Sequence, residues 1–395
     1  MKTKIQSLAQ SIHSRLISIR RHLHMHPELS FQEVNTGKFI KSILEENRIS
    51  FSGGWAEHGV VAIIGDPNKP CFALRADMDA LPILETNEVE YKSKIDGVMH
   101  ACGHDVHTTS LLGAAIILKS IEPELKGCVK LIFQPGEEKL PGGASILIKE
   151  GVLKNPNPKS MIGQHVHPPL EVGKLGFRPG KYMASADEIR LKVIGKGGHA
   201  ALPHNCVDTM LIAARILINL QDVVARNANP TIPTVLSFGK INSEGGATNV
   251  IPDVINIEGT FRTMDESWRR EAHKRIIKIA ENTASLMGGT CEVDLSVGYP
   301  CVVNEPYLTE KIKSFAIEYL GKENVVDLPI RLTSEDFGWY SQELPACFYR
   351  LGTGNTEKGI NSPVHTSSFD IDEKALIVGA GFMAFSAYKT LEHMS

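Results

Sequence analysis

Short apolar runs that alternate with helical patterns constrain the fold of this chain most strongly. Val60–Gly65, Cys71–Ala76 and Cys128–Phe133 are apolar or β-branched runs with the length of buried strands. Between the second and the third run, Thr109–Ile121 has the apolar pattern of a helix. This alternation predicts an α/β sheet. In such sheets the reactive groups lie in the loops beyond the carboxyl ends of the strands.

The chain opens with a helical pattern. Apolar residues recur at three- and four-residue steps from Lys4 to Leu23, as they do along one face of a helix. The pattern predicts a single helix that ends at His26-Pro27.

The pattern changes near Lys181. Ile189, Leu191 and Val193 alternate with charged residues, which is typical of strands with one face in water. The predicted order of elements is βαββαβ, the ferredoxin-like pattern. Its parts are strands at 187–195, 232–240, 252–262 and 291–297 and helices at 206–224 and 266–286. After Gly298 the α/β character returns, with a helix at 306–320, a strand at 345–351 and a helix at 373–391.

Composition limits the class of protein and its partners. A chain of 395 residues is long enough for two domains. A net charge of -3 without a long basic run argues against a nucleic-acid partner. No apolar run reaches the roughly 20 residues of a transmembrane helix, so no membrane association is expected. Seven cysteines without a secretion signal indicate reduced thiols and a cytoplasmic protein.

Polar motifs follow or precede these elements. The segment from His100 to His107 offers Cys102 and three imidazoles, and a Cys-x-His pair with His104 can place sulfur and nitrogen on one metal ion or on adjacent ions. Gly103 lets this loop turn tightly. The alternative is a helix-capping loop with incidental histidines.

Glu137 and Glu138 follow a buried strand, where paired carboxylates are costly unless a positive charge compensates them. A metal ion would supply that charge, with one glutamate as ligand and its neighbour as the general base that takes a proton from water. A solvated turn before a helix is the alternative.

Histidines and aspartates complete the candidates. Either His165 or His167 can face a metal from a strand end, although such histidines are often hydrogen-bonded core residues. His365 lies in a polar turn before the last helix, and it becomes a candidate ligand only when it is considered together with the other motifs. Asp77 and Asp79 follow a strand and can orient ligand imidazoles from a second layer, or cap turns.

Together these motifs resemble those of the M20 metallopeptidases, and within them the amidohydrolase branch of aminoacylases, hippurate hydrolases and auxin-conjugate hydrolases. The matching segments cover the chain from end to end, and they are Leu23–Glu28 with Phe31, Arg75–Pro82, Met99–His107, Phe133–Glu138, Gly163–Pro168, Gly197–His204, Thr248–Pro252, Thr260–Thr263 and Ser362–Phe369.

The resemblance implies roles for residues. It makes Glu137 the general base and assigns the ligands of a two-metal site to Cys102, His104, Glu138, His165 and His365. His199 resembles a lid histidine that polarises the scissile carbonyl, in several relatives from the partner subunit. Asn249 and Arg262 resemble lid residues that contact the substrate, and a guanidinium suits a carboxylate.

The resemblance also implies an architecture. An α/β fold is expected, in which a mixed-sheet di-metal catalytic domain is formed by residues 1–182 and 298–395. The ferredoxin-like insertion at 183–297 would be a lid and dimerisation domain, in a homodimer or a tetramer.

The implied activity is metal-dependent hydrolysis of N-acyl amino acids. The cofactors would be two divalent ions, with zinc, manganese, cobalt and nickel as candidates and zinc favoured by sulfur. A dipeptidase or carboxypeptidase, an N-acetyl-diamino-acid deacetylase and a non-catalytic metal- or carboxylate-binding protein are the alternatives.

Overall fold

A computed structural model describes residues 1–394 of the chain. They form two compact units, each described here by itself. Unit 1 comprises Met1–Gly180, Val303–Ile330 and the chain from Trp339 onward, and unit 2 comprises Lys181–Val302 and Arg331–Gly338. Within the described residues, no helix combines the length and the apolar character needed to span a membrane.

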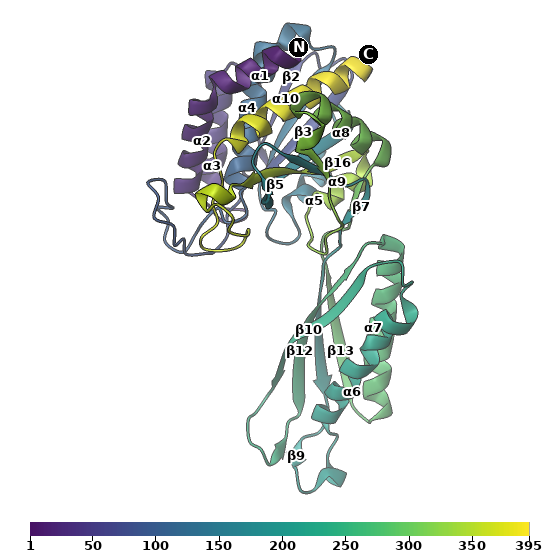
Figure 1. Ribbon diagram of the computed structural model, residues 1–395. Helices are drawn as coiled ribbons and strands as arrows, with labels where there is room; N and C mark the ends of the chain where they lie inside the picture. The colour runs from purple at the N-terminus through teal and green to yellow at the C-terminus, as the bar shows by residue number, and fades with distance from the viewer. Residues whose placement is uncertain (395) are drawn as a thin grey trace. The chain divides into compact units, whose positions relative to one another are not determined.

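Unit 1 is built on an eight-stranded mixed sheet (Figure 1). Its strand order is β1 (Ser50–Trp55), β2 (Gly59–Gly65), β4 (Cys128–Gln134), β3 (Cys71–Asp77), β5 (Pro158–Glu171), β16 (Ala346–Gly354), β6 (Leu175–Phe177) and β15 (Val325–Asp327). The central strands β4, β3, β5 and β16 are parallel. The α/β fold with a mixed sheet is therefore confirmed.

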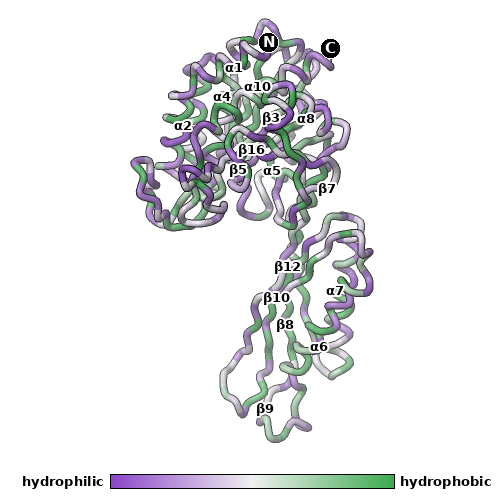
Figure 2. Tube along the Cα trace, viewed as in Figure 1, coloured by the Kyte–Doolittle hydropathy of each residue, from purple (hydrophilic) through white to green (hydrophobic). Residues whose placement is uncertain are grey.

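The helices of unit 1 bury the apolar faces of this sheet. They are α1 (Lys2–Ser11), α2 (His13–Met25), α3 (Val34–Glu46), α4 (His104–Ser120), α5 (Gly143–Glu150), α8 (Pro306–Leu320) and α10 (Ala375–Met394), with α9 (Gly338–Glu343) at the start of the last segment. α4 is buried all round from His104 to Leu118, as expected for a helix without a polar face. Figure 2 shows the hydrophobic stretches gathered around α4 and α10.

The opening helix differs from the prediction. α1 ends at Ser11 and α2 begins at His13, because Ile12 leaves helical geometry at φ -96° and ψ 5°. The Ser11 hydroxyl donates to the Leu8 carbonyl at 2.8 Å and competes with the backbone ladder there. The edge strand β1 was not predicted, since most of its side chains are exposed and its sequence lacks a clear apolar alternation.

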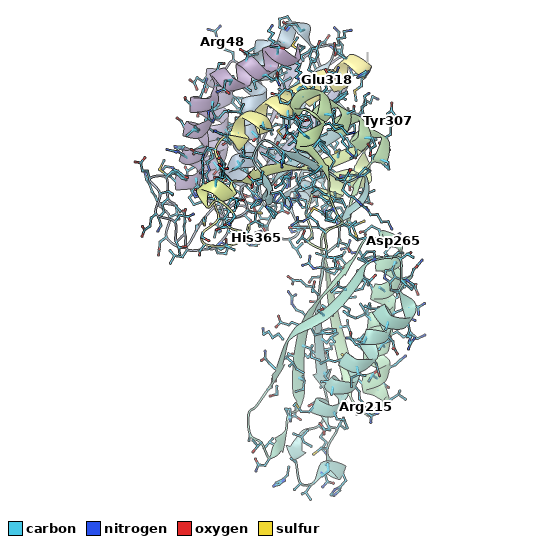
Figure 3. All side chains as sticks on the ribbon, viewed as in Figure 1. Arg48, Arg215, Asp265, Tyr307, Glu318 and His365 are labelled. Carbon is cyan, nitrogen blue, oxygen red and sulfur yellow. The ribbon has the colours of Figure 1, made fainter. Side chains whose placement is uncertain are left out.

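Unit 2 has the element order β8 (Asp187–Ile194), α6 (Thr209–Asp222), β10 (Thr234–Ser243), β12 (Val254–Thr263), α7 (Glu266–Leu286) and β13 (Thr290–Val297). Its antiparallel sheet has the strand order β10-β12-β8-β13, as in the ferredoxin-like pattern. A short pair, β9 (Gly198–His199) and β11 (Val250–Ile251), extends from this sheet. Asp265, labelled in Figure 3, accepts a hydrogen bond from the Trp268 amide and so caps α7.

Candidate metal centre

The candidate site lies where the central strands of unit 1 end. Asp77, the last residue of β3, pairs with Gln134, the last residue of β4. On the other side, Arg75 of β3 pairs with Gly163 of β5, so His165 lies two residues further along β5, near the level of Asp77. Parallel strands thus deliver their polar ends to one edge of the sheet, as expected for α/β folds.

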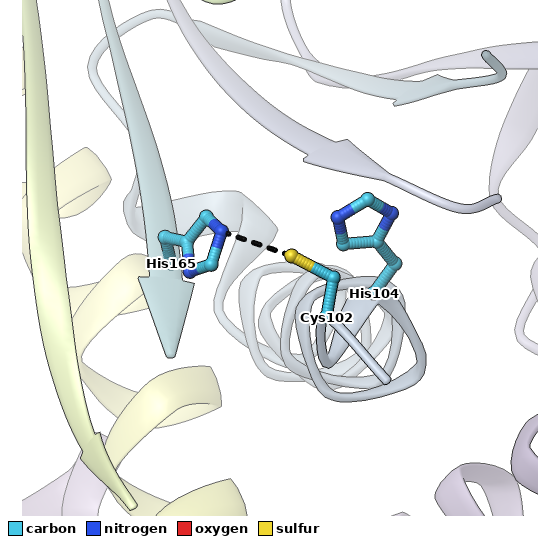
Figure 4. Close-up of side chains that lie close together, drawn as sticks. All are labelled: Cys102, His104 and His165. Carbon is cyan, nitrogen blue, oxygen red and sulfur yellow. Dashed lines mark hydrogen bonds between the residues drawn. The ribbon is translucent and has the colours of Figure 1, made fainter. Parts of the chain in front are cut away.

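Cys102 and His104 enter this edge from the start of α4. Gly103 between them has φ +83°, and a Cβ there would lie 2.7 Å from Val166 Cγ2. The loop therefore depends on glycine for both its conformation and its space. His104 is fully buried and Cys102 is 6% exposed, and the two side chains face His165 across the site (Figure 4).

The Cys102 sulfur lies between two histidines. Its Sγ is 3.5 Å from His165 Nε2 and 3.3 Å from His365 Nε2. The backbone of His365 is anchored beside the cysteine, because its amide donates to the Ala101 carbonyl at 2.8 Å. The half-exposed ring of His365 also lies 3.1 Å from Glu138 Oε1. Figure 3 labels His365 at the edge of unit 1.

The side chains form two overlapping groups with the composition of metal sites. Cys102, His104 and His165 form one, and Cys102, Glu138 and His365 form the other; in each group the ligand atoms lie within 4.8 Å of one another. A third group joins Glu137 to His104 and Glu138. The structure thus brings together all five residues expected to be ligands and the residue expected to be the base. Sulfur, imidazole and carboxylate are a donor set that suits zinc and neighbouring divalent ions.

His104 is oriented by its own hydrogen bond. Its Nδ1 donates to Asp79 Oδ1 at 3.0 Å, while its buried Nε2 has no hydrogen-bond partner within residues 1–394. The second oxygen of Asp79 accepts from the Ser30 hydroxyl at 2.7 Å and from the Glu138 amide at 2.9 Å. The expected hydrogen bond from an imidazole to Asp79 is present, and an Nε2 without a partner among the described residues fits a metal ligand.

Other histidines near the site have different surroundings. His107 donates from Nδ1 to Asp77 at 2.5 Å, and its Nε2 accepts from the Val166 amide at 2.8 Å, so both ring nitrogens are occupied. Burial lowers the pKa of His100 to about 4, which keeps that ring neutral. The metal-type groups found within residues 1–394 include His165 and not His167.

Without a cation, the electrostatics of the site oppose a thiolate. Burial and the Glu138 carboxylate raise the pKa of Cys102 above its usual range. Contacts with Cys102 and then Glu138 raise the pKa of His365 to about 10. A divalent ion reverses this balance, because it stabilises a coordinated thiolate and keeps imidazole deprotonated.

Glu33 is a residue of this site that sequence reasoning missed. Its side chain is fully buried, and Oε1 accepts a hydrogen bond from the Gly136 amide at 2.7 Å, next to Glu137. Burial and nearby Asp79 raise the pKa of Glu33 to about 8. Gly136 has φ +65°, and a Cβ there would meet the Phe31 ring at 2.4 Å. In sequence, Glu33 is an acidic residue before a helix, and no local signal reveals its burial.

The remaining predicted residues lie in unit 2. His199 and Asn249 are exposed neighbours, since β9 pairs with β11 and the Ala200 amide donates to the Asn249 carbonyl at 2.9 Å. Arg262 lies near the C-terminal end of β12, whereas β11 directly precedes Val254 at the N-terminal end of that strand. At 3.3 Å per residue, Arg262 is about 26 Å along the strand from Val254. Its guanidinium donates to Ser334 Oγ at 3.3 Å. Within unit 2, Arg262 therefore lies far from His199 and Asn249.

Comparison with known proteins identifies the family of this chain. Residues 73–388 match peptidase family M20/M25/M40. The chain is 40% identical to N-acetyl-L-cysteine deacetylase of Bacillus subtilis (strain 168) over 384 residues, which cover 97% of this chain and 89% of that protein. It is 39% identical to IAA-amino acid hydrolase ILR1-like 4 of Arabidopsis thaliana over 380 residues, covering 95% and 86%.

A solved structure agrees. The crystal structure of the Bacillus subtilis YXEP protein, a dinuclear metal-binding peptidase of the M20 family, superposes with a TM-score of 0.84 and 36% identity. The match covers 97% of this chain and 99% of that one. The chain therefore belongs to peptidase family M20/M25/M40 and is a metal-dependent amidohydrolase.

Proposed function

We propose that this enzyme hydrolyses the amide bond of N-acyl amino acids and releases a free amino acid and a carboxylic acid. The observation that carries the proposal is the pair of metal-type groups that share Cys102, with Glu137 beside them. Two relatives support the substrate class, because one is named for N-acetyl-L-cysteine and the other for IAA-amino acids. Both names describe an acyl group on an amino acid.

We assign the ligands from the two groups. His104 and His165 would hold one ion, Glu138 and His365 the other, and the Cys102 sulfur would serve both. Bound ions supply Lewis acidity at the scissile carbonyl and lower the pKa of water from near 16 towards 7. Zinc, manganese, cobalt and nickel all accept such ligands, and the sulfur favours zinc.

Glu137 is the general base of this proposal. Its side chain is only 6% exposed, and a carboxylate oxygen lies within 4.8 Å of ligand atoms of both His104 and Glu138. Glu137 takes the proton from the attacking water and then passes it to the nitrogen of the leaving amine. The hydrogen bond from the Gly136 amide to Glu33 holds the turn that presents this carboxylate.

Unit 2 would act as a lid and as the dimer contact of a homodimer. The exposed His199 would donate a hydrogen bond to the oxyanion that develops at the scissile carbonyl, from this subunit or its partner. Asn249 and Arg262 would bind the substrate, with the planar guanidinium of Arg262 on the carboxylate of the amino acid.

The test is amino-acid release from N-acetyl, N-benzoyl and indole-acetyl amino acids and from dipeptides, with zinc- or manganese-loaded enzyme. Glu137→Gln is the control, because it keeps the shape of the side chain and loses the base. Removal of a general base commonly costs about 10²- to 10⁴-fold in rate. Cleavage of acyl amino acids by the wild type alone supports the proposal. Cleavage of dipeptides only would make the enzyme a dipeptidase or carboxypeptidase. If the enzyme with two metals bound cleaved no compound of the panel, a diamino-acid deacetylase with a narrow substrate range would be favoured.

A further inference from the structure

His107 lies where two strands of the main sheet stop pairing. β3 and β5 are paired as far as Arg75 and Gly163, and beyond that level β5 has no partner residue on β3 within residues 1–394. The buried amides that follow on this side of β5 need other acceptors, because an unpaired buried N–H is costly. His107, in the first turn of α4, supplies one of them. Its fully buried ring accepts a hydrogen bond at Nε2 from the Val166 amide at 2.8 Å.

The partners of His107 decide where its ring proton is. A backbone amide can only donate, so Nε2 of His107 carries a lone pair. The proton is then on Nδ1, which donates to Asp77 Oδ1 at 2.5 Å. The other oxygen of Asp77 accepts from Arg75 Nη1 at 2.6 Å, and this ion pair is fully buried. The guanidinium therefore keeps Asp77 an anion, and the anion keeps His107 in a single tautomer.

The same residue of β5 also holds the ring of His165. A carbonyl can only accept, so Nδ1 of His165 carries the proton and donates to the Val166 carbonyl at 2.8 Å. Nε2 of His165 is then the nitrogen with a lone pair, and it lies 3.5 Å from Cys102 Sγ (Figure 4). Val166 thus connects the two histidines, since its amide donates to His107 and its carbonyl accepts from His165.

We propose that His107 is a positioning residue for the metal ligand His165, on which it acts through the backbone of Val166. This inference rests on the proposed metal-dependent hydrolysis, in which His165 is a ligand. Every donor on the path from His165 points toward Asp77, and in a buried site such bonds strengthen one another. The path fixes the ring of His165 and makes its Nε2 a better electron donor. His107 does not itself bind the ion in this arrangement, because both of its ring nitrogens are occupied.

Two substitutions at His107 separate the two contacts of its ring. A glutamine side chain is long enough to place its carboxamide near the site of Nε2, where the oxygen accepts from Val166, whereas asparagine reaches only the site of Nδ1, beside Asp77. Both variants carry an uncharged amide, so each is the control of the other. His107→Asn should lower the affinity for one of two zinc ions about 10- to 100-fold, and His107→Gln should stay within about threefold of the wild type. Competition with a chromophoric chelator measures both, and equal affinities in the two variants overturn the inference.

Double variants identify the ion that His107 affects. His107→Asn combined with His365→Ala should lose both ions, because the two changes weaken different ions. Combined with His165→Ala it should still retain one ion, because both changes weaken the same ion. Metal content after dialysis against a weak chelator gives the counts, and the reverse pattern overturns the inference. Fewer than two ions in the zinc-loaded wild type before dialysis would instead overturn the proposed two-metal site, and the inference with it.

A measurement on the wild type does not depend on the folding of any variant. Long-range nitrogen–proton NMR spectra of the histidine rings report which nitrogen carries the proton. In the metal-free enzyme, His107 and His165 should both carry it on Nδ1, and added zinc should shift the Nε2 signal of His165 far more than that of His107. A proton on Nε2 of His107, or a zinc-induced shift there as large as that at His165, overturns the inference.

Discussion

The ring of His104 donates a hydrogen bond from Nδ1 to the Asp79 carboxylate at 3.0 Å. This bond orients the ring, and the buried Nε2 has no hydrogen-bond partner among the described residues. Asp79 also accepts from the Glu138 amide, so a single buried carboxylate positions two proposed ligands. A carboxylate of this kind matters to metal binding without touching the metal.

Replacing Asp79 should therefore weaken metal binding. Loss of a group that orients a metal ligand typically costs about 10- to 100-fold in affinity, and we expect this range for Asp79→Ala. Competition between the enzyme and a chromophoric chelator measures it. Asp96→Ala, which changes an exposed carboxylate of the same unit, is the control. Equal affinities in the two variants would contradict the role of Asp79.

Cys102 should matter to both ions. Because its sulfur belongs to both metal-type groups, Cys102→Ala should lose both ions, whereas His165→Ala and His365→Ala should each lose one. Metal content by mass spectrometry after dialysis gives the number directly. Cys206→Ala, a change in unit 2, should retain two ions. Two ions in Cys102→Ala would refute the shared sulfur.

Glu33 should act as a positioning residue for Glu137. Glu33→Ala removes the acceptor for the Gly136 amide, and we expect kcat to fall about 10- to 100-fold with KM changed less than about twofold. Glu33→Gln keeps an oxygen for that amide and should restore most of kcat. Steady-state kinetics at equal metal content separate this role from loss of metal. If Glu33→Gln were as slow as Glu33→Ala with both ions bound, the hydrogen bond would not be the cause.

A buried ion pair beneath the site should dominate local stability. Arg20 Nε donates to Asp105 Oδ2 at 2.9 Å, and both side chains are fully buried. Arg20→Met leaves that carboxylate without its guanidinium and should destabilise the fold by about 3–5 kcal/mol. Arg15→Met, which breaks the exposed pair with Glu46, should cost less than about 1 kcal/mol. Chemical denaturation followed by fluorescence measures the free energy of unfolding of both variants. Equal losses of this free energy in Arg20→Met and Arg15→Met would contradict the prediction.

Unit 2 should lose stability in acid through Asp187. Burial opposes ionisation of this carboxyl, but hydrogen bonds from Arg269 and His273 outweigh burial and hold the pKa of Asp187 below its usual range. A lowered folded pKa stabilises the fold above the unfolded value near 4, and this contribution is lost as the pH falls through the folded value. Asp187→Asn should lower the melting temperature at pH 7 and show a weaker dependence on pH below about 4. Calorimetry from pH 3 to pH 7 tests this, and parallel curves would contradict it.

Several elements could be predicted because their causes are local. α7 and α8 have the bounds expected from periodicity, since Asp265 and Glu305 cap their first turns. The polar motifs at strand ends also supplied the candidate ligands, because sulfur, imidazole and carboxylate are metal donors. Each motif alone left a structural alternative, and the ligand set came from the resemblance to the M20 metallopeptidases. The break at Ile12 was missed, because the apolar residues keep their three- and four-residue spacing across it.

The sequence by itself determined the α/β class and the set of side chains available for metal chemistry, because both follow from local pattern and residue type. Only the tertiary structure decided which of these side chains lie close together in one site. It distinguished His104 from His107: within residues 1–394 the His104 Nε2 has no hydrogen-bond partner, whereas the two nitrogens of His107 are occupied by Asp77 and Val166. It also buried Glu33 against Gly136, 103 residues away along the chain. Such contacts depend on how strands and loops pack in space, and no local pattern of residues encodes that packing.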